Sequence, residues 1–412
     1  MGKLRLSRKE RARLDVLRKV EAGKLSRRVA AELLGVSYRQ TLRLVERYLA
    51  EGAAGLKHRL REQESNRRIG TDRQRRIVSL YRSKYHDFGP TLAVEYLASV
   101  DGEQVGIETL RRWLIQAGLW QARRRGARHR AWRERRAHRG ELVQMDGSDH
   151  DWFEGRRARA TLMVLIDDAT NWTYAKFFES ETTVAAMVAF WEYVKRYKLP
   201  RALYVDRDSI YETTRDSTVD EALRDQPPLT QFGRAMQTLE IELILAHSPQ
   251  AKGRVERRHG VFQDRLVKAM RLKGISDLEA ANAFLEQEFL GKLNARFHVV
   301  PRSQTDVHRA VPRDMRLEHV LCFQEERTVR NDWTVSWRNR VLQLSVKHQK
   351  LALGGKKIMV SELLDGRLRL THRGRELSWT ELPARPPRSA PKRTAGKPTK
   401  RRYKPPTNHP WR

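Results

Sequence analysis

Three acidic residues stand in sequence contexts where carboxylates can carry out metal chemistry. Asp146 lies in LVQMDGSDHDW, Asp206 in ALYVDRDS and Glu256 in HSPQAKGRVERRHG. Carboxylate oxygens are the ligands that Mg²⁺ prefers, and two such ions can clamp the attacking and leaving oxygens of a phosphodiester. If the three side chains converge, they support phosphodiester cleavage or transfer with two Mg²⁺ ions, for which Mn²⁺ can substitute.

Each of these acids also has an ordinary structural interpretation. Asp146 can end a strand, Asp206 can begin a turn, and Glu256 can pair with Arg257 or Arg258. Structural carboxylates are common, so one acid alone would be weak support for catalysis. The joint arrangement favours the catalytic interpretation.

The elements around these acids predict a mixed α/β sheet with helices packed on it. Asp146 falls on the first strand, before Gly147, which lets another group approach the backbone closely. Asp206 ends the fourth strand, where α/β sheets place functional groups. Glu256 is one turn into a long helix, on the same face as His259 and Gln263. The predicted strands are residues 142–152, 160–166, 172–178, 202–205 and 242–246, and the predicted helices are 182–198, 231–239, one that begins at residue 253, and 277–294.

Basic residues beside Glu256 are predicted to contact the DNA backbone next to the metal ions. These residues are Lys252, Arg254 and Arg257. Several other acids are interpreted as structural or supporting: Asp149, Asp151, Asp167, Asp168 and Asp208. Two histidines, His150 and His247, can also lie near the site, although a single histidine is more often structural.

The composition points to a nucleic-acid partner. The chain has 412 residues, which predicts two to four domains, and its 83 lysines and arginines against 50 acidic residues give a formal charge of +33. Such an excess repels itself unless a polyanion neutralises it. An anionic membrane is a weaker alternative, because no apolar run approaches the length of a spanning helix. We therefore expect a cytoplasmic protein that associates with the nucleoid.

Several classes of protein are excluded by missing signatures. The single cysteine, Cys322, rules out an internal disulfide and a zinc site built from several thiolates. The sequence has no Walker-type phosphate loop, no GxGxxG, no GxSxG and no HExxH. We therefore predict catalysis without a nucleotide cofactor.

The N-terminal segment LSRRVAAELLGVSYRQTLRLVERYLAEG predicts a helix-turn-helix. Gly35 is placed at the sharp turn, and Ser37 can cap the second helix. The alternative is a plain helical hairpin with a solvated basic face. The side chains predicted to face outward, toward a DNA major groove, are Tyr38, Arg39, Gln40, Arg43 and Arg47.

The remaining segments complete a multidomain prediction. Residues 72–120 resemble a second helix-turn-helix, and the nine arginines between residues 122 and 140 predict an exposed linker that contacts phosphates. Short strands after residue 314, with hairpins at 327–335 and 362–370, predict a small β-barrel. From residue 383, eight prolines and ten lysines or arginines with no acidic residue predict a disordered tail.

Five segments resemble DDE transposases of bacterial insertion sequences, in particular the ISNCY-like group of the retroviral-integrase superfamily. They are LVQMDGSDHDWFEGR, LMVLIDDATN, ALYVDRDSIY, the stretch from TQFGRAMQ through SPQAKGRVERRHG to EAANAFL, and PRSQTDVH. The resemblance implies an RNase H-like core with metal ligands at Asp146, Asp206 and Glu256. It also implies hydrolysis at the transposon ends, followed by attack of the freed 3′-hydroxyl on target DNA. The acidic, polar stretch at residues 212–228 departs from the compact integrase pattern.

The expected partners are therefore terminal repeats and target DNA, bound by a homo-oligomer on paired ends. Two alternatives remain open, a DNA-binding regulator or inactive copy, and a nuclease that cuts without joining. The predicted division is a helix-turn-helix domain (1–60), a second helical domain (61–121), a linker (122–140), a catalytic core (141–312), a β-barrel (313–382) and a tail (383–412).

Overall fold

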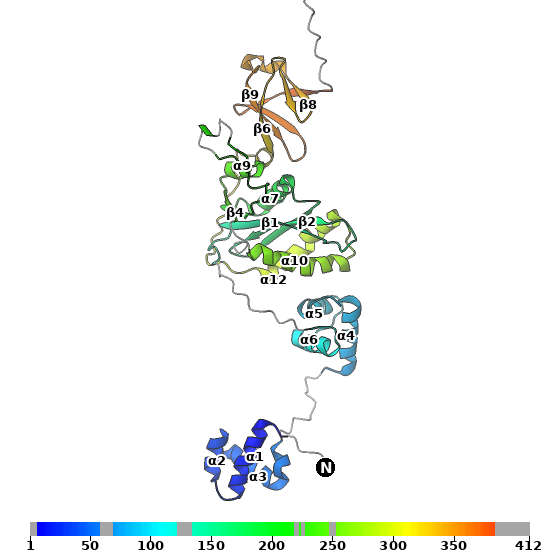
Figure 1. The fold of residues 1–412 in the computed structure, drawn as a ribbon, viewed down its shortest axis with the longest axis vertical. Coiled ribbons are helices and arrows are strands. Elements are labelled where there is room, and N and C mark those ends of the chain that lie inside the picture. The colour runs from blue at the N-terminus through cyan, green and yellow to red at the C-terminus, as the bar shows by residue number, and fades with distance from the viewer. Residues whose placement is uncertain are drawn as a thin grey trace, which may run out of the picture. The chain divides into compact units, whose positions relative to one another are not determined.

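The structure is a computed structural model that describes residues 6–57, 69–121, 134–217, 222–223, 227–246 and 253–383 (Figure 1). The chain forms two compact units, Met1–Arg123 and Arg124–Arg412. The predicted linker lies outside the described residues except for its last seven positions, and the predicted tail lies outside them except for its first.

The first unit begins with a small helical domain. Gly35 adopts a left-handed conformation (φ 61°) between the second and third helices, and Ser37 caps the third by accepting from the Gln40 N–H at 3.3 Å. Leu17 and Leu44 lie in its core. The predicted helix–turn–helix geometry is present. The helices are α1 (Arg8–Glu21), α2 (Arg27–Leu34), α3 (Tyr38–Glu51) and the short η1 (Gly52–Leu56).

A second group of helices has a separate core. Tyr81, Leu110 and Leu114 are fully buried there, and the Tyr81 hydroxyl donates to the Phe88 carbonyl at 2.8 Å. The hydrogen bond satisfies the one polar atom that this tyrosine takes into the core. The helices are α4 (Thr71–Lys84), α5 (Pro90–Ser99) and α6 (Ile107–Gln116).

The second unit is built on a five-stranded mixed sheet of order β3-β2-β1-β4-β5. The first three strands are antiparallel neighbours, whereas β1 pairs with β4, and β4 with β5, in parallel. Every residue of β2 is buried, which requires cover on both faces of the sheet. The strands are β1 (Leu142–His150), β2 (Ala160–Asp167), β3 (Thr173–Phe178), β4 (Ala202–Val205) and β5 (Glu242–Leu245).

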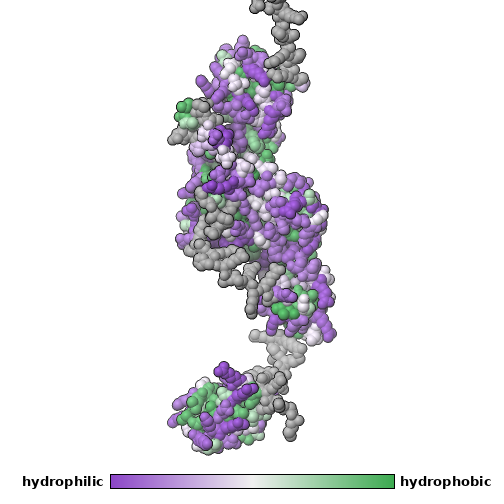
Figure 2. All heavy atoms as spheres, in the orientation of Figure 1, coloured by the Kyte–Doolittle hydropathy of each residue, from purple (hydrophilic) through white to green (hydrophobic). Residues whose placement is uncertain are grey.

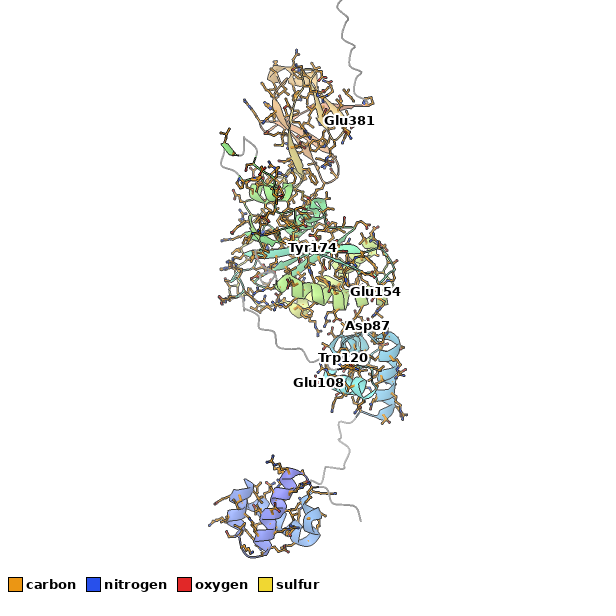
Figure 3. The ribbon with its side chains drawn as sticks, in the orientation of Figure 1. Asp87, Glu108, Trp120, Glu154, Tyr174 and Glu381 are labelled. Atoms are coloured by element: carbon orange, nitrogen blue, oxygen red, sulfur yellow. The ribbon has the colours of Figure 1, made fainter. Side chains whose placement is uncertain are left out.

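Helices supply this cover on both faces. Figure 1 shows α7 and α9 on one side of the sheet, with α10 and α12 on the other. The Tyr174 hydroxyl in β3 donates to Glu192 in α7 at 2.6 Å, which fixes α7 to the sheet (Figure 3). The helices are α7 (Thr183–Tyr197), α9 (Gln231–Thr238), α10 (Gly253–Leu272), α11 (Leu278–Phe284), the π-helical η3 (Leu285–Phe289) and α12 (Leu290–Phe297).

The C-terminal strands form two sheets rather than the closed barrel that the sequence predicts. One sheet has the order β11-β10-β9-β6 and the other β12-β8-β7, and the two share one apolar core. The expected hairpin at residues 327–335 is wrong, because β6 pairs with β9 and β7 pairs with β8. Because β6 and β7 belong to different sheets and do not pair, the predicted barrel is not closed. The elements are α13 (Leu317–Val320), β6 (Phe323–Thr328), β7 (Thr334–Trp337), β8 (Arg340–Leu344), η4 (Val346–Leu351), β9 (Lys357–Glu362), β10 (Leu368–His372), β11 (Arg375–Leu377) and β12 (Trp379–Leu382).

Hydrophilic residues cover most of the visible surface of the sheet-containing unit (Figure 2). No helix within the described residues is long and apolar enough to cross a membrane. Cys322 is fully buried, with a free thiol.

Candidate active site

Strand register brings Asp146 and Asp206 to corresponding positions on neighbouring strands. The parallel pairing of β1 with β4 places Gln144 opposite Tyr204. Asp146 and Asp206 each lie two residues beyond that pair, and both are half-buried. Asp206 directly follows the end of β4. Since side chains alternate along a strand and neighbouring strands are about 4.8 Å apart, continuing this register would direct both carboxylates to the same face of the sheet.

The first turn of α10 lies over β1 next to Asp146. The Val255 N–H points at the Gln144 side-chain oxygen at 3.4 Å, two residues before the aspartate. One turn later, His259 Nδ1 is 3.7 Å from Asp146 Oδ2. Glu256 lies between these two contacts and its side chain is exposed.

An ion pair fixes the start of α10 on the sheet. Arg254 Nη1 is 3.1 Å from Asp168 Oδ1, with exposed side-chain fractions of 8% and 0%. The same aspartate accepts from the Gln144 side-chain amide at 2.9 Å and from the Arg136 N–H at 2.9 Å. At the other end of α10, Arg271 Nη1 is 2.9 Å from the Oε1 atom of Glu154, which is labelled in Figure 3. α10 is therefore held at both ends while its Glu256 face stays open.

These contacts correct one expectation from the sequence. Arg254 was predicted to contact DNA, but its guanidinium is buried against Asp168 and supports the fold. Arg257, one turn further along α10, is exposed as expected. Lys252 and His247 lie outside the described residues.

The other acids near the site make structural contacts. Asp167 accepts from the Gly140 N–H at 2.8 Å and from the Thr170 hydroxyl at 2.6 Å, within a turn where burial raises the pKa of its carboxyl. Asp149 pairs with Arg159 at 3.1 Å. Asp151 accepts from the Gly155 N–H at 3.1 Å, Asp208 accepts from the Ile210 N–H at 2.9 Å, and the His150 ring packs against Trp152.

The donor set suits a divalent cation, although the described residues do not form a complete site. No three Asp, Glu, His or Cys side chains in the described part of the chain are grouped so that they could hold a metal ion. Two aspartates in register do supply hard oxygen ligands of the kind that Mg²⁺ takes from proteins. Glu256, in the first turn of α10, is the exposed acid of the helix that packs against β1.

Two further side chains near the strand that carries Asp146 could not be identified from the sequence. Glu181 lies two residues before the start of α7, and its carboxylate occupies the space where a side chain at Gly147 would stand. Tyr211 is buried, and burial together with the carboxylates of Glu181, Asp206 and Asp146 raises its pKa far above the ordinary value. Both were missed because no spacing rule links a residue before a helix, or one in a loop, to a distant strand.

The outward face of α3 carries the predicted DNA contacts. Tyr38, Arg39, Gln40 and Arg43 are exposed. Arg47 differs, because it is half-buried and donates to the Lys57 carbonyl at 3.2 Å.

Known proteins resemble the chain over most of its length. Residues 7–57 match the Homeodomain-like domain family. The protein named Putative transposase y4bF from Sinorhizobium fredii is 38% identical over 383 residues, which are 92% of this chain and 82% of that protein. The Transposase for insertion sequence IS1202 from Streptococcus pneumoniae is 25% identical over an alignment of 439 positions, gaps included, which covers 96% of this chain and 92% of that protein. Among solved structures, the dimeric HTLV-2 integrase catalytic core domain in complex with magnesium aligns with 37% of this chain and 91% of its own, at 16% identity and a TM-score of 0.27.

The assignment of a family follows from the two sequence relatives. Both are named as transposases, and both align with more than nine tenths of this chain. They confirm the resemblance seen in the sequence motifs, and the chain belongs to the transposases of bacterial insertion sequences.

Proposed function

We propose that this protein catalyses metal-dependent cleavage of DNA at the ends of an insertion sequence and transfer of the cut ends into target DNA. The observation that supports the proposal is the parallel register of β1 and β4, two residues before Asp146 and Asp206, together with the first turn of α10 over β1. An acidic pair on two neighbouring strands, one within β1 and one directly after β4, next to a helix with an exposed glutamate, is the arrangement that a DDE active site requires.

In this proposal, Asp146, Asp206 and Glu256 hold two Mg²⁺ ions, and Mn²⁺ can replace them. Bound there, the ions stabilise the attacking and leaving oxygens of an in-line displacement at phosphorus. His259 lies against Asp146 and limits the orientations of that carboxylate. The contacts of Arg254 hold the first turn of α10, and with it Glu256, over the strand.

We assign DNA binding to two surfaces, the exposed face of α3 and the basic residues beside the proposed active site. Tyr38, Arg39, Gln40 and Arg43 on α3 would read the terminal repeat in the major groove. Arg257 would contact a phosphate beside the active site, and we propose the same role for Lys252. The formal charge of +33 suits a chain that binds both an element end and target DNA.

Further parts of the proposal follow from the reaction. One active site must be brought to each element end, so the protein would act as a homo-oligomer on paired ends. It would work in the cytoplasm, where the bacterial nucleoid lies. We propose the same six segments that the sequence predicts, from the helix-turn-helix domain (1–60) to the tail (383–412). The one change is that the segment 313–382 contains two open sheets instead of a barrel.

The test uses the full-length protein, a duplex that ends in the element's terminal repeat, a plasmid target and Mg²⁺. Wild-type protein is expected to nick the duplex and join it to the plasmid. Asp146→Asn, Asp206→Asn and Glu256→Gln are each expected to bind the duplex normally and to lose more than about a hundredfold in both steps, because even outer-shell changes around metals cost about 10–100-fold. Asp149→Asn is the matched control, since Asp149 lies on the same strand but pairs with Arg159.

The outcomes separate the alternatives. Cleavage without joining would indicate a nuclease. Variants that cut as well as wild type would contradict the assigned acids. Tight, specific binding without cleavage by any form of the protein would favour a regulator or an inactive copy.

A further inference from the structure

Three arginines lie close to the ring of Phe297, the last residue of α12. The Cζ atoms of Arg258 and Arg265, both in α10, are each 5.3 Å from the centre of this ring. The Cζ atom of Arg296 is 5.9 Å from the same centre. An aromatic ring attracts cations to its face, but it has no net charge. The ring therefore brings the three guanidinium groups together without neutralising them.

Asn171, in the turn between β2 and β3, joins a fourth arginine to this group. Arg258 Nη2 donates to the Asn171 backbone carbonyl at 3.2 Å, and Arg135 Nη1 donates to the Asn171 side-chain oxygen at 2.8 Å. The Asn171 side-chain amide donates in turn to the Phe297 carbonyl at 3.3 Å. Two positive charges are thus bound to one small residue. We call the four side chains the Phe297 arginine cluster: Arg135, Arg258, Arg265 and Arg296.

Arg258 is the buried member of the cluster, and its charge has no counter-ion among the described residues. It is 5% exposed, and its Nη1 atom has no hydrogen-bond partner in the described part of the chain. Arg254, one turn earlier on the same side of α10, differs because it pairs with Asp168 at 3.1 Å. A buried charge without an opposite charge is costly. An anion bound at the cluster would offset that cost.

The cluster extends from the interior to the surface. Arg135 and Arg265 are half-buried, and Arg296 is exposed. An anion can therefore approach through the exposed part of the cluster, and the buried charge of Arg258 attracts it through an interior of lower dielectric constant than water. Guanidinium groups suit phosphate in particular, because their planar donors match the spacing of two phosphate oxygens.

The chain segments that adjoin the cluster contain no acid that could supply the counter-charge. Residues 122–133, directly before the segment with Arg135, include six arginines and no acidic residue, and residues 247–252, directly before α10, include none either. Both segments lie outside the described residues. A polyanion outside the chain fits this excess, and a DNA backbone presents closely spaced phosphates.

We propose that the Phe297 arginine cluster binds phosphate groups of the DNA backbone, as a contact separate from the active site. Arg258 follows Glu256 by two residues, and side chains at this spacing do not share a face of a helix. The inference rests on the DNA-binding part of the proposed function. A purely structural role is the competing explanation: Arg258 would only tie the turn at Asn171 to α10. That role would affect folding but not the affinity for DNA.

The experiment measures binding of the full-length protein to a duplex of unrelated sequence by fluorescence anisotropy, at several KCl concentrations and with EDTA present. The slope of log affinity against log salt concentration reports how many phosphates the protein neutralises. Arg258→Gln and Arg265→Gln are each expected to reduce this slope by about 1, whereas Arg258→Lys keeps the charge and should keep the slope. Arg196→Gln in α7 is the matched control and should also keep it. Arg196 lies over the Tyr174 ring at 5.4 Å, but its charge is already paired with Glu286.

Because EDTA removes divalent ions, the result does not depend on the proposed metal site. Reduced slopes in both glutamine variants, with wild-type slopes in Arg258→Lys and Arg196→Gln, support the inference. Wild-type slopes in both glutamine variants refute it and leave the proposed active site standing. If the wild-type protein does not bind the duplex, the DNA binding in the proposed function is overturned and this inference with it.

Melting temperatures show whether each variant is folded and whether inorganic phosphate binds. If Arg258→Gln does not fold, Arg265→Gln decides, because its side chain does not hold the turn at Asn171. A wild-type slope in Arg265→Gln then overturns the inference. If 10 mM-range phosphate, on the order of intracellular anion levels, stabilises wild type but not Arg258→Gln while the slopes are unchanged, the cluster binds a free anion and the DNA contact is refuted.

Discussion

At the scale of single residues, the contact between Arg254 and Asp168 shows how the site is supported. Both side chains are removed from water, where an isolated charge is costly, and they lie 3.1 Å apart. Asp168 also accepts from Gln144 and from the Arg136 backbone, so its oxygens are well satisfied. The pair joins the turn after β2 to the start of α10, and thereby helps to place Glu256.

Replacing Arg254 by methionine is expected to destabilise the sheet-containing unit by roughly 3–5 kcal/mol, because it leaves Asp168 buried without its charge partner. Hydrogen exchange of the β1 and β2 amides in the full-length protein measures this change. Arg257→Met should stay within about 0.5 kcal/mol of wild type, as exposed substitutions do. Equal effects of the two substitutions would show that the ion pair does not stabilise the unit.

The sequence could identify which acids belong together, but not all of their neighbours. Asp146, Asp206 and Glu256 stand in local motifs that can be read directly. Arg254 was misplaced because its partner, Asp168, comes from a turn far away in the chain. Nothing in the local pattern of α10 distinguishes it from the exposed Arg257.

At the scale of elements, α3 is the helix with the most direct functional consequence. Its capping serine and the left-handed Gly35 fix the angle at which it leaves α2. Arg39 and Arg43 are exposed four residues apart, so they lie on the same side of the helix. A helix presented in this way can place both guanidinium groups in a major groove.

We expect Arg39→Ala and Arg43→Ala each to cost roughly 1–3 kcal/mol of discrimination between end DNA and an unrelated duplex. Fluorescence anisotropy at fixed salt concentration with both duplexes measures this difference. Lys19→Ala, at an exposed position in α1, removes the same charge and should weaken binding to both duplexes equally. If Arg39→Ala and Arg43→Ala also weaken binding to both duplexes equally, α3 contacts only phosphates and does not read the base sequence.

Most elements could be predicted from periodicity and caps, and the failures have a clear cause. β4 begins and ends where expected, and α10 begins at Gly253 as predicted. The hairpin at 362–370 forms around Gly366 (φ 81°), which supplies its turn. The hairpin at 327–335 does not form: β6 pairs with β9, while Arg338 and Asn339, both with positive φ, turn β7 onto β8. Local patterns locate strands, but pairing depends on contacts between distant segments.

At the scale of the whole molecule, charge and motifs were enough to predict a DNA-binding transposase, which the two sequence relatives bear out. The prediction that the C-terminal strands close into a barrel was wrong. Closure depends on pairing between distant strands, which the local residue pattern does not contain. The strand register that sets Asp146 beside Asp206 was also beyond the sequence. More than fifty residues separate these acids, and it is the parallel pairing of β1 with β4 that brings their segments of the chain together.

The most direct test of the central claim is a crystal structure of the protein bound to a pre-cut element end and Mn²⁺, with the ions located by anomalous diffraction. We expect Mn²⁺ about 2.2 Å from carboxylate oxygens of both Asp146 and Asp206, with the Glu256 carboxylate turned toward the same ions. Ions bound without these two aspartates, or a Glu256 side chain directed away from them, would contradict the proposed active site.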